Sequence, residues 1–199
     1  SGYRSLFTNT TGANNTATGH KALYSNTTAS YNTAYGVSAL QNTTTGACNT
    51  AVGYNALISN TTGKANTVAG YSAAQVNTTG AYNAVFGYQA LAANTTGEAN
   101  IAIGYQTATN ITTGAQNVAV GHRALNQSQT ANNNVAIGFD ALYYTSTGAN
   151  NTASGYRALF SNTTANFNTA VGSCTLYANT TGAQNTGMGF CTLVSTTSG

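Results

Sequence analysis

The chain has 199 residues, of which only seven are charged, five Lys or Arg and two Asp or Glu, so its formal net charge is +3. Five scattered basic residues are no footprint for nucleic acid or an acidic membrane, so no nucleic-acid partner is expected. Disorder is excluded as well, because disordered chains are usually charged and poor in aromatic residues, whereas this chain has 13 Tyr and 6 Phe. No apolar run approaches the roughly 18 residues of a membrane span, and no signal peptide precedes Ser1, so membrane insertion is not expected.

A glycine recurs every 17 residues from Gly2 to Gly189, without insertion or deletion. The unit that begins at Gly53 reads G-Y-N-A-L-I-S-N-T-T-G-K-A-N-T-V. Such a unit is too short for the common helical repeats, which need about 33 residues or more, and Thr, Asn and Gly are poor helix formers. The repeat therefore predicts one all-β domain over residues 1–199, a parallel β-solenoid (β-roll) of about twelve coils. Each coil is expected to hold two strands of about five residues and two turns.

Within each unit the predicted elements follow one another in the same order. Leu, four places after the glycine, is expected to line the interior, and the N-T-T-G-A stretch predicts a turn, since Asn and Gly tolerate positive φ. Asn, four places before the next glycine, predicts an asparagine ladder at a turn that continues the backbone ladder outward. The structural ladders comprise Gly53, Gly70, Gly87 and Gly104; Asn66, Asn83, Asn100 and Asn117; Leu57, Leu91, Leu125 and Leu142; and Thr62, Thr79 and Thr96.

Alternation along the last strand of the unit separates its side chains between two faces. The Ala two places before each glycine is expected inside, and the residues on either side of the glycine point the other way. That outer face either forms a second part of the core or packs against a partner chain, and a large apolar patch favours lateral self-association. It carries the aliphatic residues Val52, Ile103, Val120, Ile137 and Val171 and the aromatic residues Tyr54, Tyr71, Tyr88, Tyr105 and Phe139.

Both termini stop in mid-repeat, and the first and last coils match the consensus about as well as the others. Solenoids normally carry atypical capping repeats, and uncapped coils expose unpaired strand edges. With no caps predicted, either the natural protein is longer or chains stack end to end into a filament.

No catalytic constellation, metal site or cofactor site is expected, and the chain is predicted not to be an enzyme. The two acids, Glu98 and Asp140, lie in different columns of the repeat and cannot share acid–base work. His20 and His122 replace the aromatic residue that follows the glycine, so they are expected to act as ring substitutes. The three cysteines lack the C-x-x-C spacing of a zinc site.

Two further groups share a column in successive coils. Cys174 and Cys191 would lie about 4.8 Å apart, within the disulfide range, although in-register parallel neighbours seldom present the required side-chain angles, so a disulfide is one of two outcomes. Arg123, Asp140 and Arg157 are expected to form a small surface charge ladder that contributes little to stability if exposed. A ligand clamp is the less favoured alternative for these three.

The N-T-A-V-G and N-V-A-I-G segments resemble the head repeats of trimeric autotransporter adhesins. That resemblance implies a left-handed β-roll in which three chains pack together on a bacterial surface. The complete unit is more similar to arrays in phage and bacterial tail-fibre-like proteins, and this second resemblance covers nearly the whole chain.

These patterns predict a structural, self-associating extracellular fibre or filament subunit. Its partners are expected to be copies of itself, laterally or end to end, as a filament or a homotrimer, outside the cell, on its surface or in a virion fibre. An adhesin that binds host or glycan surfaces through Tyr- and Thr-rich faces is the alternative. Ice binding is the weaker alternative, because consecutive threonines point to opposite sides and a two-rank array would have to pair the Asn and the second Thr of N-T-T.

Overall fold

The three residues before each glycine are mostly Thr or a β-branched residue, then Ala, then an aliphatic or aromatic residue, a composition that favours extended backbone. In the computed structural model of the chain, which describes residues 1–195 and 197, they form one three-residue strand per coil. The strands are β1 (Thr16–Thr18), β2 (Thr33–Tyr35), β3 (Thr50–Val52), β4 (Thr67–Ala69), β5 (Ala84–Phe86), β6 (Ile101–Ile103), β7 (Val118–Val120), β8 (Val135–Ile137), β9 (Thr152–Ser154), β10 (Thr169–Val171) and β11 (Thr186–Met188).

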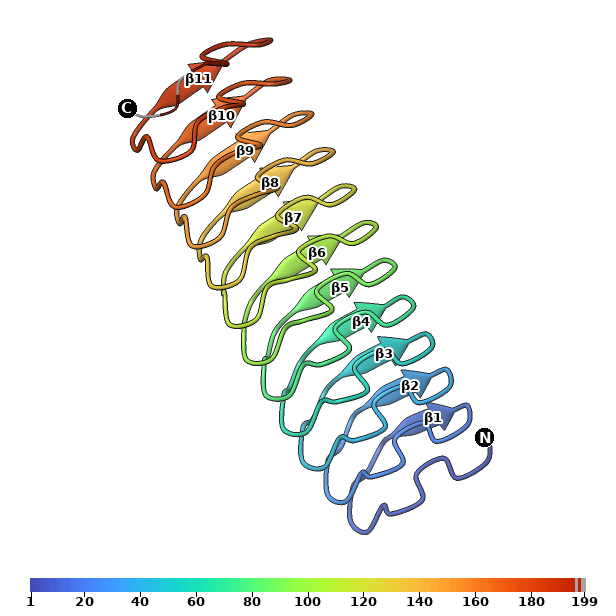
Figure 1. Cartoon of the computed structure of the whole chain (residues 1–199). Helices are drawn as coiled ribbons and strands as arrows, with labels where there is room; N and C mark the ends of the chain where they lie inside the picture. The colour runs from blue at the N-terminus through green and yellow to red at the C-terminus, as the bar shows by residue number, and fades with distance from the viewer. Residues whose placement is uncertain (196, 198–199) are drawn as a thin grey trace.

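All eleven strands form one parallel sheet in chain order, and equivalent residues of successive coils pair, as in Thr16↔Thr33 and Ala17↔Ala34. The coils stack into a rod whose N- and C-termini lie at opposite ends (Figure 1). The predicted parallel β-solenoid is confirmed. The sheet has eleven strands, whereas about twelve coils were expected. Each strand consists of the three residues before a glycine, and only Ser1 precedes Gly2, so the first glycine has no strand before it.

The prediction of a second strand in each coil is wrong. After the glycine the backbone makes successive turns, closed by the N–H of Ala22 donating to Gly19 O at 3.3 Å and by Tyr24 N–H donating to Lys21 O at 3.3 Å. Lys21 and Leu23 have φ values of 55° and 50°, the left-handed conformation that a type II turn requires at its third residue. Neighbouring coils are also hydrogen-bonded here, since Leu23 N–H donates to Ala39 O at 3.1 Å.

Positive φ at non-glycine residues recurs in three columns of the repeat, including the leucine column. The left-handed conformation costs an L-residue roughly 1–2 kcal/mol. In the leucine column this cost is offset by complete burial, as at Leu57 and Leu91, and by the hydrogen bonds to the next coil. The half-buried Ala65, with φ 54°, has no such large apolar side chain to bury.

Replacing Ala65 by Gly should therefore raise the free energy of unfolding by about 0.5–1 kcal/mol. The substitution removes the left-handed penalty, which exceeds the entropy that Gly gains in the unfolded chain. The matched control is Ala47→Gly, at a half-buried position without positive φ, which should instead lower stability by about 0.5–1 kcal/mol. Urea unfolding midpoints test the pair, and an Ala65→Gly variant less stable than the parent chain would contradict this account.

The interior of the rod is formed by the leucine column and by the alanine column two places before each glycine. A Cβ placed on Gly187, in the alanine column, would lie 3.4 Å from Leu176 Cγ, so the two columns pack against each other. Where the leucine column holds Ala74, the facing position holds the buried Val85 in place of Ala, which restores apolar volume. The predicted interior positions of both columns are thus confirmed over the length of the core.

Candidate functional site

The described part of the chain is a rod without a pocket, and it holds no group of three or more His, Cys, Asp or Glu that could bind a metal ion. Nor does any helix among these residues have the length and apolar character to cross a membrane. The side chains that could act on a partner are arranged in columns along the surfaces of the rod.

The glycine column that starts each repeat lies very close to the backbone of the next coil. Gly87 has φ 140°, and a Cβ on it would clash with the carbonyl oxygen of Gly104 in the next coil. Gly53, Gly70 and Gly104 meet the following coil in the same way. Both the backbone conformation and the space therefore require glycine in every coil.

The asparagine ladder is confirmed, but it lies in the interior and does not extend the backbone ladder outward. Asn117 Oδ1 accepts hydrogen bonds from Asn134 N–H at 3.0 Å and Asn134 Nδ2 at 3.3 Å. Its own Nδ2 donates to Asn100 Oδ1 at 3.0 Å and to Ala131 O at 2.9 Å. Burial is tolerated because the amides satisfy one another and the turn carbonyls. The same pattern holds at Asn66, Asn83 and Asn100.

A second buried asparagine ladder, not predicted, is formed by the Asn that precedes the two threonines. Asn77 Nδ2 donates to Asn60 Oδ1 at 2.9 Å and to Gly80 O at 3.0 Å. Because these Asn side chains are buried, they cannot pair with the second threonine as the surface array that ice binding was expected to need. The signal was present in the repeated N-T-T itself, since an Asn that recurs in register at a turn is placed to stack.

The two threonines of N-T-T differ in role. The hydroxyl of the first donates to the next coil, as in Thr61 Oγ1 to Thr78 O at 3.1 Å and Thr78 Oγ1 to Thr95 O at 3.0 Å. The second threonine is exposed in coil after coil, including Thr62, Thr79 and Thr96. The threonine ladder is therefore formed by the first threonine of each N-T-T, and not by the second threonine, which the sequence predicted.

The outer face of the sheet has an apolar column directly before the glycine in most coils, whereas the column three places before the glycine is Thr in seven of the eleven strands and apolar from β5 to β8. Val52, Phe86, Ile103 and Ile137 leave about two fifths of their surface exposed, at 41%, 41%, 40% and 42%. Ile101, at the first position of its strand, is also exposed on this face. Three columns face outward: the residue three places before the glycine, the residue directly before it and the residue directly after it. None of these columns contains Asp, Glu, Lys or Arg.

The aromatic column, which follows the glycine, lies at one edge of this face and forms a continuous stack of rings from Tyr54 to Tyr156. The rings of Tyr54, Tyr71, Tyr88 and Tyr105 lie parallel, with centroids 5.1–5.3 Å apart. His122 continues the stack, 5.1 Å from Tyr105 and 4.7 Å from Phe139, so its predicted role as a ring substitute is confirmed. The ring faces cover one another, which leaves the ring edges and the tyrosine hydroxyl groups toward solvent.

The group Arg123, Asp140 and Arg157 is not the exposed ladder that was expected. Asp140 is buried, with 1% of its side chain exposed, and binds Arg123 through two bonds of 3.0 Å, while Arg157 Nε lies 3.6 Å away. The hydrogen bonds to Asp140 raise the pKa of Arg123, although desolvation opposes them. The burial of Asp140 was not predicted. Its short side chain lies between two long arginine side chains, whose apolar stems can cover it.

Cys174 and Cys191 are free thiols in this structure, the first half-buried and the second exposed, and Cys48 is also free. Desolvation raises the pKa of Cys191, and the neighbouring Cys174 thiol adds to the shift. The disulfide between this pair stays a prediction about an oxidising environment.

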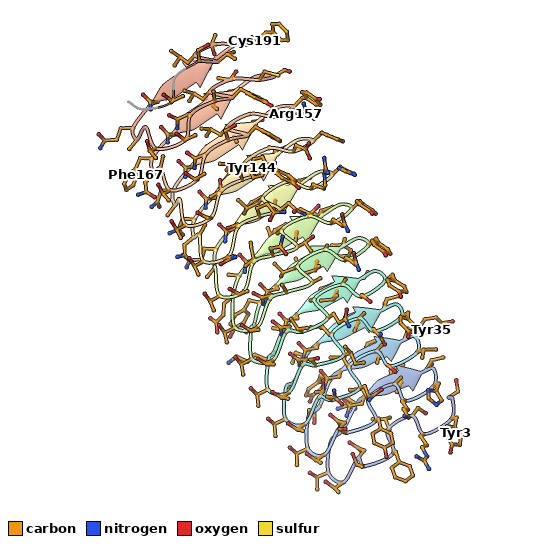
Figure 2. The ribbon with its side chains drawn as sticks, in the orientation of Figure 1. Tyr3, Tyr35, Tyr144, Arg157, Phe167 and Cys191 are labelled. Carbon is orange, nitrogen blue, oxygen red and sulfur yellow. The ribbon has the colours of Figure 1, made fainter. Side chains whose placement is uncertain are left out.

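The charged residues are also less scattered than they look along the sequence. Five of the seven, Arg4, Lys21, Arg123, Asp140 and Arg157, follow a glycine by two places and so share one column of the rod. In Figure 2, Arg157 and Cys191 lie on the same long side of the rod as Tyr3 and Tyr35, whereas Phe167 lies on the opposite side.

The outer sheet face and the charged column are the two candidate surfaces, and both are built by repetition. In comparisons with known proteins, no family model matches the chain, and neither a curated protein nor a solved structure is found to be similar to it.

Proposed function

We propose that this chain is a structural, self-associating fibre subunit that works outside the cell, on its surface or in a virion fibre. The observation that carries the proposal is the uncharged outer face of the eleven-stranded sheet, with its exposed aliphatic and aromatic side chains, which no part of the described chain covers. The resemblance of the repeat to tail-fibre-like arrays and adhesin heads supports the same role.

Parallel sheets normally have both faces covered. Here the inner face packs on the leucine column, while Val52, Ile103 and Ile137 on the outer face remain exposed. A second copy is the occupant that fits best, since its face has the same spacing between coils and is equally free of charged residues. Two such faces can interdigitate along the rod without burying an unpaired charge.

The size of the face fits this role. Eleven strands about 4.8 Å apart and a face about 13 Å wide give on the order of 600 Å² per chain. This area lies at the lower end of the range of about 600–1,000 Å² per partner that stable interfaces bury. The predicted self-association residues Tyr54, Tyr71, Tyr88 and Tyr105 are therefore placed at the rim of the proposed interface, with the aliphatic column at its centre.

The double variant Ile103→Lys/Ile137→Lys tests the proposal, because each lysine would place an unpaired charge in the interface. We expect the association constant, measured by sedimentation velocity over a range of concentrations, to fall at least about a hundredfold. The matched control is Thr113→Lys/Thr147→Lys, which adds the same charges at exposed positions of the coil that follows each of these isoleucines, on another side of the rod. If both double variants associate like the parent chain, the outer sheet face is not the interface.

Adhesion to a glycan-bearing surface is the second candidate, and a separate observation favours it. The charged residues gather in the column directly after the aromatic one, outside the uncharged columns of the outer sheet face.

A further inference from the structure

The net charge of the chain is carried by a single line along the rod. We call this line the charged column; its ionised members are Arg4, Lys21, Arg123, Asp140 and Arg157, which sum to +3. The remaining two charges, Lys64 and Glu98, share a different column and cancel. Since adjacent coils are about 4.8 Å apart, Lys21 and Arg157, eight coils apart, are separated by about 38 Å along the rod.

Each end of the charged column runs between two aromatic rows. At the first end, the Arg4 guanidinium lies 5.2 Å from the Tyr3 ring centroid and 5.4 Å from that of Phe7. At the other, Arg157 lies 5.2 Å from Tyr156 and 5.3 Å from Phe160. Aromatic residues five places after the glycine occur mainly in these coils, where they hold the cation in one orientation.

Two of the four cations, Arg4 and Lys21, have no ion-pair partner among the described residues, and a third, Arg157, is paired only through a longer contact. Both carboxylate oxygens of Asp140 accept hydrogen bonds from Arg123, and Asp140 Oδ2 lies 3.6 Å from Arg157 Nε. The Arg157 side chain is 36% exposed. Arg4 is exposed and Lys21 half-buried, and the sequence has no carboxylate in their coils.

Between the two cationic ends, the same column is neutral but forms hydrogen bonds. It presents the half-buried Asn55, Gln89 and Gln106, whose amides can donate and accept. Gln106 Nε2 donates to Gln89 Oε1 at 3.0 Å, which shows that these amides align along the rod. Beside them runs the row of exposed tyrosine edges.

We propose that the charged column is a binding line for an acidic polysaccharide, a linear glycan with carboxylate or sulfate groups, lying along the rod. Its acidic groups bind at Arg4, Lys21 and Arg157, and its hydroxyl groups bind the amides and the tyrosine hydroxyls between them. A second copy of the chain does not fit, because its charged column carries the same sign. Single-stranded nucleic acid fits less well, because its bases need open aromatic faces and these faces are stacked on one another.

The proposal is tested by binding to immobilised heparin, with hyaluronan as a carboxylate-only probe and dextran as a neutral one. The variant Arg4→Gln/Lys21→Gln/Arg157→Gln should bind heparin at least about tenfold more weakly, with a shallower dependence on salt. Lys64→Gln, which removes a cation outside the column, should change binding less than about twofold. Arg123 is left unchanged, because its loss would leave Asp140 buried without its partner.

Three results would overturn the proposal: equal heparin binding by the triple variant and the parent chain, no binding of either acidic glycan, or binding confined to oligo(dT) or to phosphatidylserine vesicles. Circular dichroism of the triple variant checks that the solenoid is intact. Sedimentation velocity on the same samples separates a lost glycan site from a change in association.

Discussion

Gly87→Ala is expected to lower the free energy of unfolding by about 4 kcal/mol. The φ of 140° at Gly87 lies in a region open only to glycine, at a cost of about 1–3 kcal/mol for another residue, and the new methyl group would clash with Gly104 O, which adds about 1–3 kcal/mol. Because each coil contacts only its neighbours, the damage should divide the rod and make unfolding less cooperative.

Urea unfolding followed by circular dichroism measures this effect, with Gly97→Ala as the control. Gly97 also packs closely on the next coil, but it lacks a positive φ, and the corresponding position already holds Ala in three other coils. Its replacement should cost about 1 kcal/mol. Equal losses in the two variants would mean that crowding alone, and not the backbone conformation, requires the glycine column. The three natural alanines are Ala29, Ala131 and Ala165.

Asn117→Ala should cost about 3–4 kcal/mol, the largest effect expected for a polar side chain in this protein. The truncation leaves the N–H of Asn134 and the carbonyl of Ala131 buried without a partner. Each unsatisfied buried group costs about 1–3 kcal/mol. The same urea titration measures the loss.

Two further variants separate hydrogen bonding from packing at this site. Asn117→Asp keeps the shape of the side chain but loses every hydrogen bond that Nδ2 donates and buries a charge, so at neutral pH it should be at least as destabilising as Asn117→Ala. Asn42→Ala, at an exposed position, should change stability by less than about 0.5 kcal/mol. A nearly neutral Asn117→Asp would show that the ladder is held by packing alone.

Most of the fold can be predicted from the period of the repeat. Because the coils stack in register, equivalent residues of all coils can be compared within one sequence. It is sufficient to predict the parallel sheet, the buried Leu91 and the asparagine ladder at Asn100. The absence of a second strand could not be predicted from the sequence. It depends on left-handed backbone conformation at Leu57 and Gln89, and neither Leu nor Gln favours that conformation. What stabilises it there is the hydrogen bonding between coils, which a propensity scale does not contain.

The candidate surfaces were predictable to different degrees. The exposed aliphatic face follows from alternation along three residues, as Val52 and Ile103 illustrate. Burial of Asp140 depends on how the two neighbouring Arg side chains fold over it, which no spacing encodes. The charged column, by contrast, was available from the sequence, because Lys21 and Arg157 differ by a whole number of repeats.

Electron microscopy of the purified chain at micromolar concentration tests the central claim, lateral association through the outer sheet face, most directly. We predict rods packed side by side, and single rods when Ile103 and Ile137 are both replaced by Lys. Dispersed single rods of the parent chain across that concentration range would contradict it.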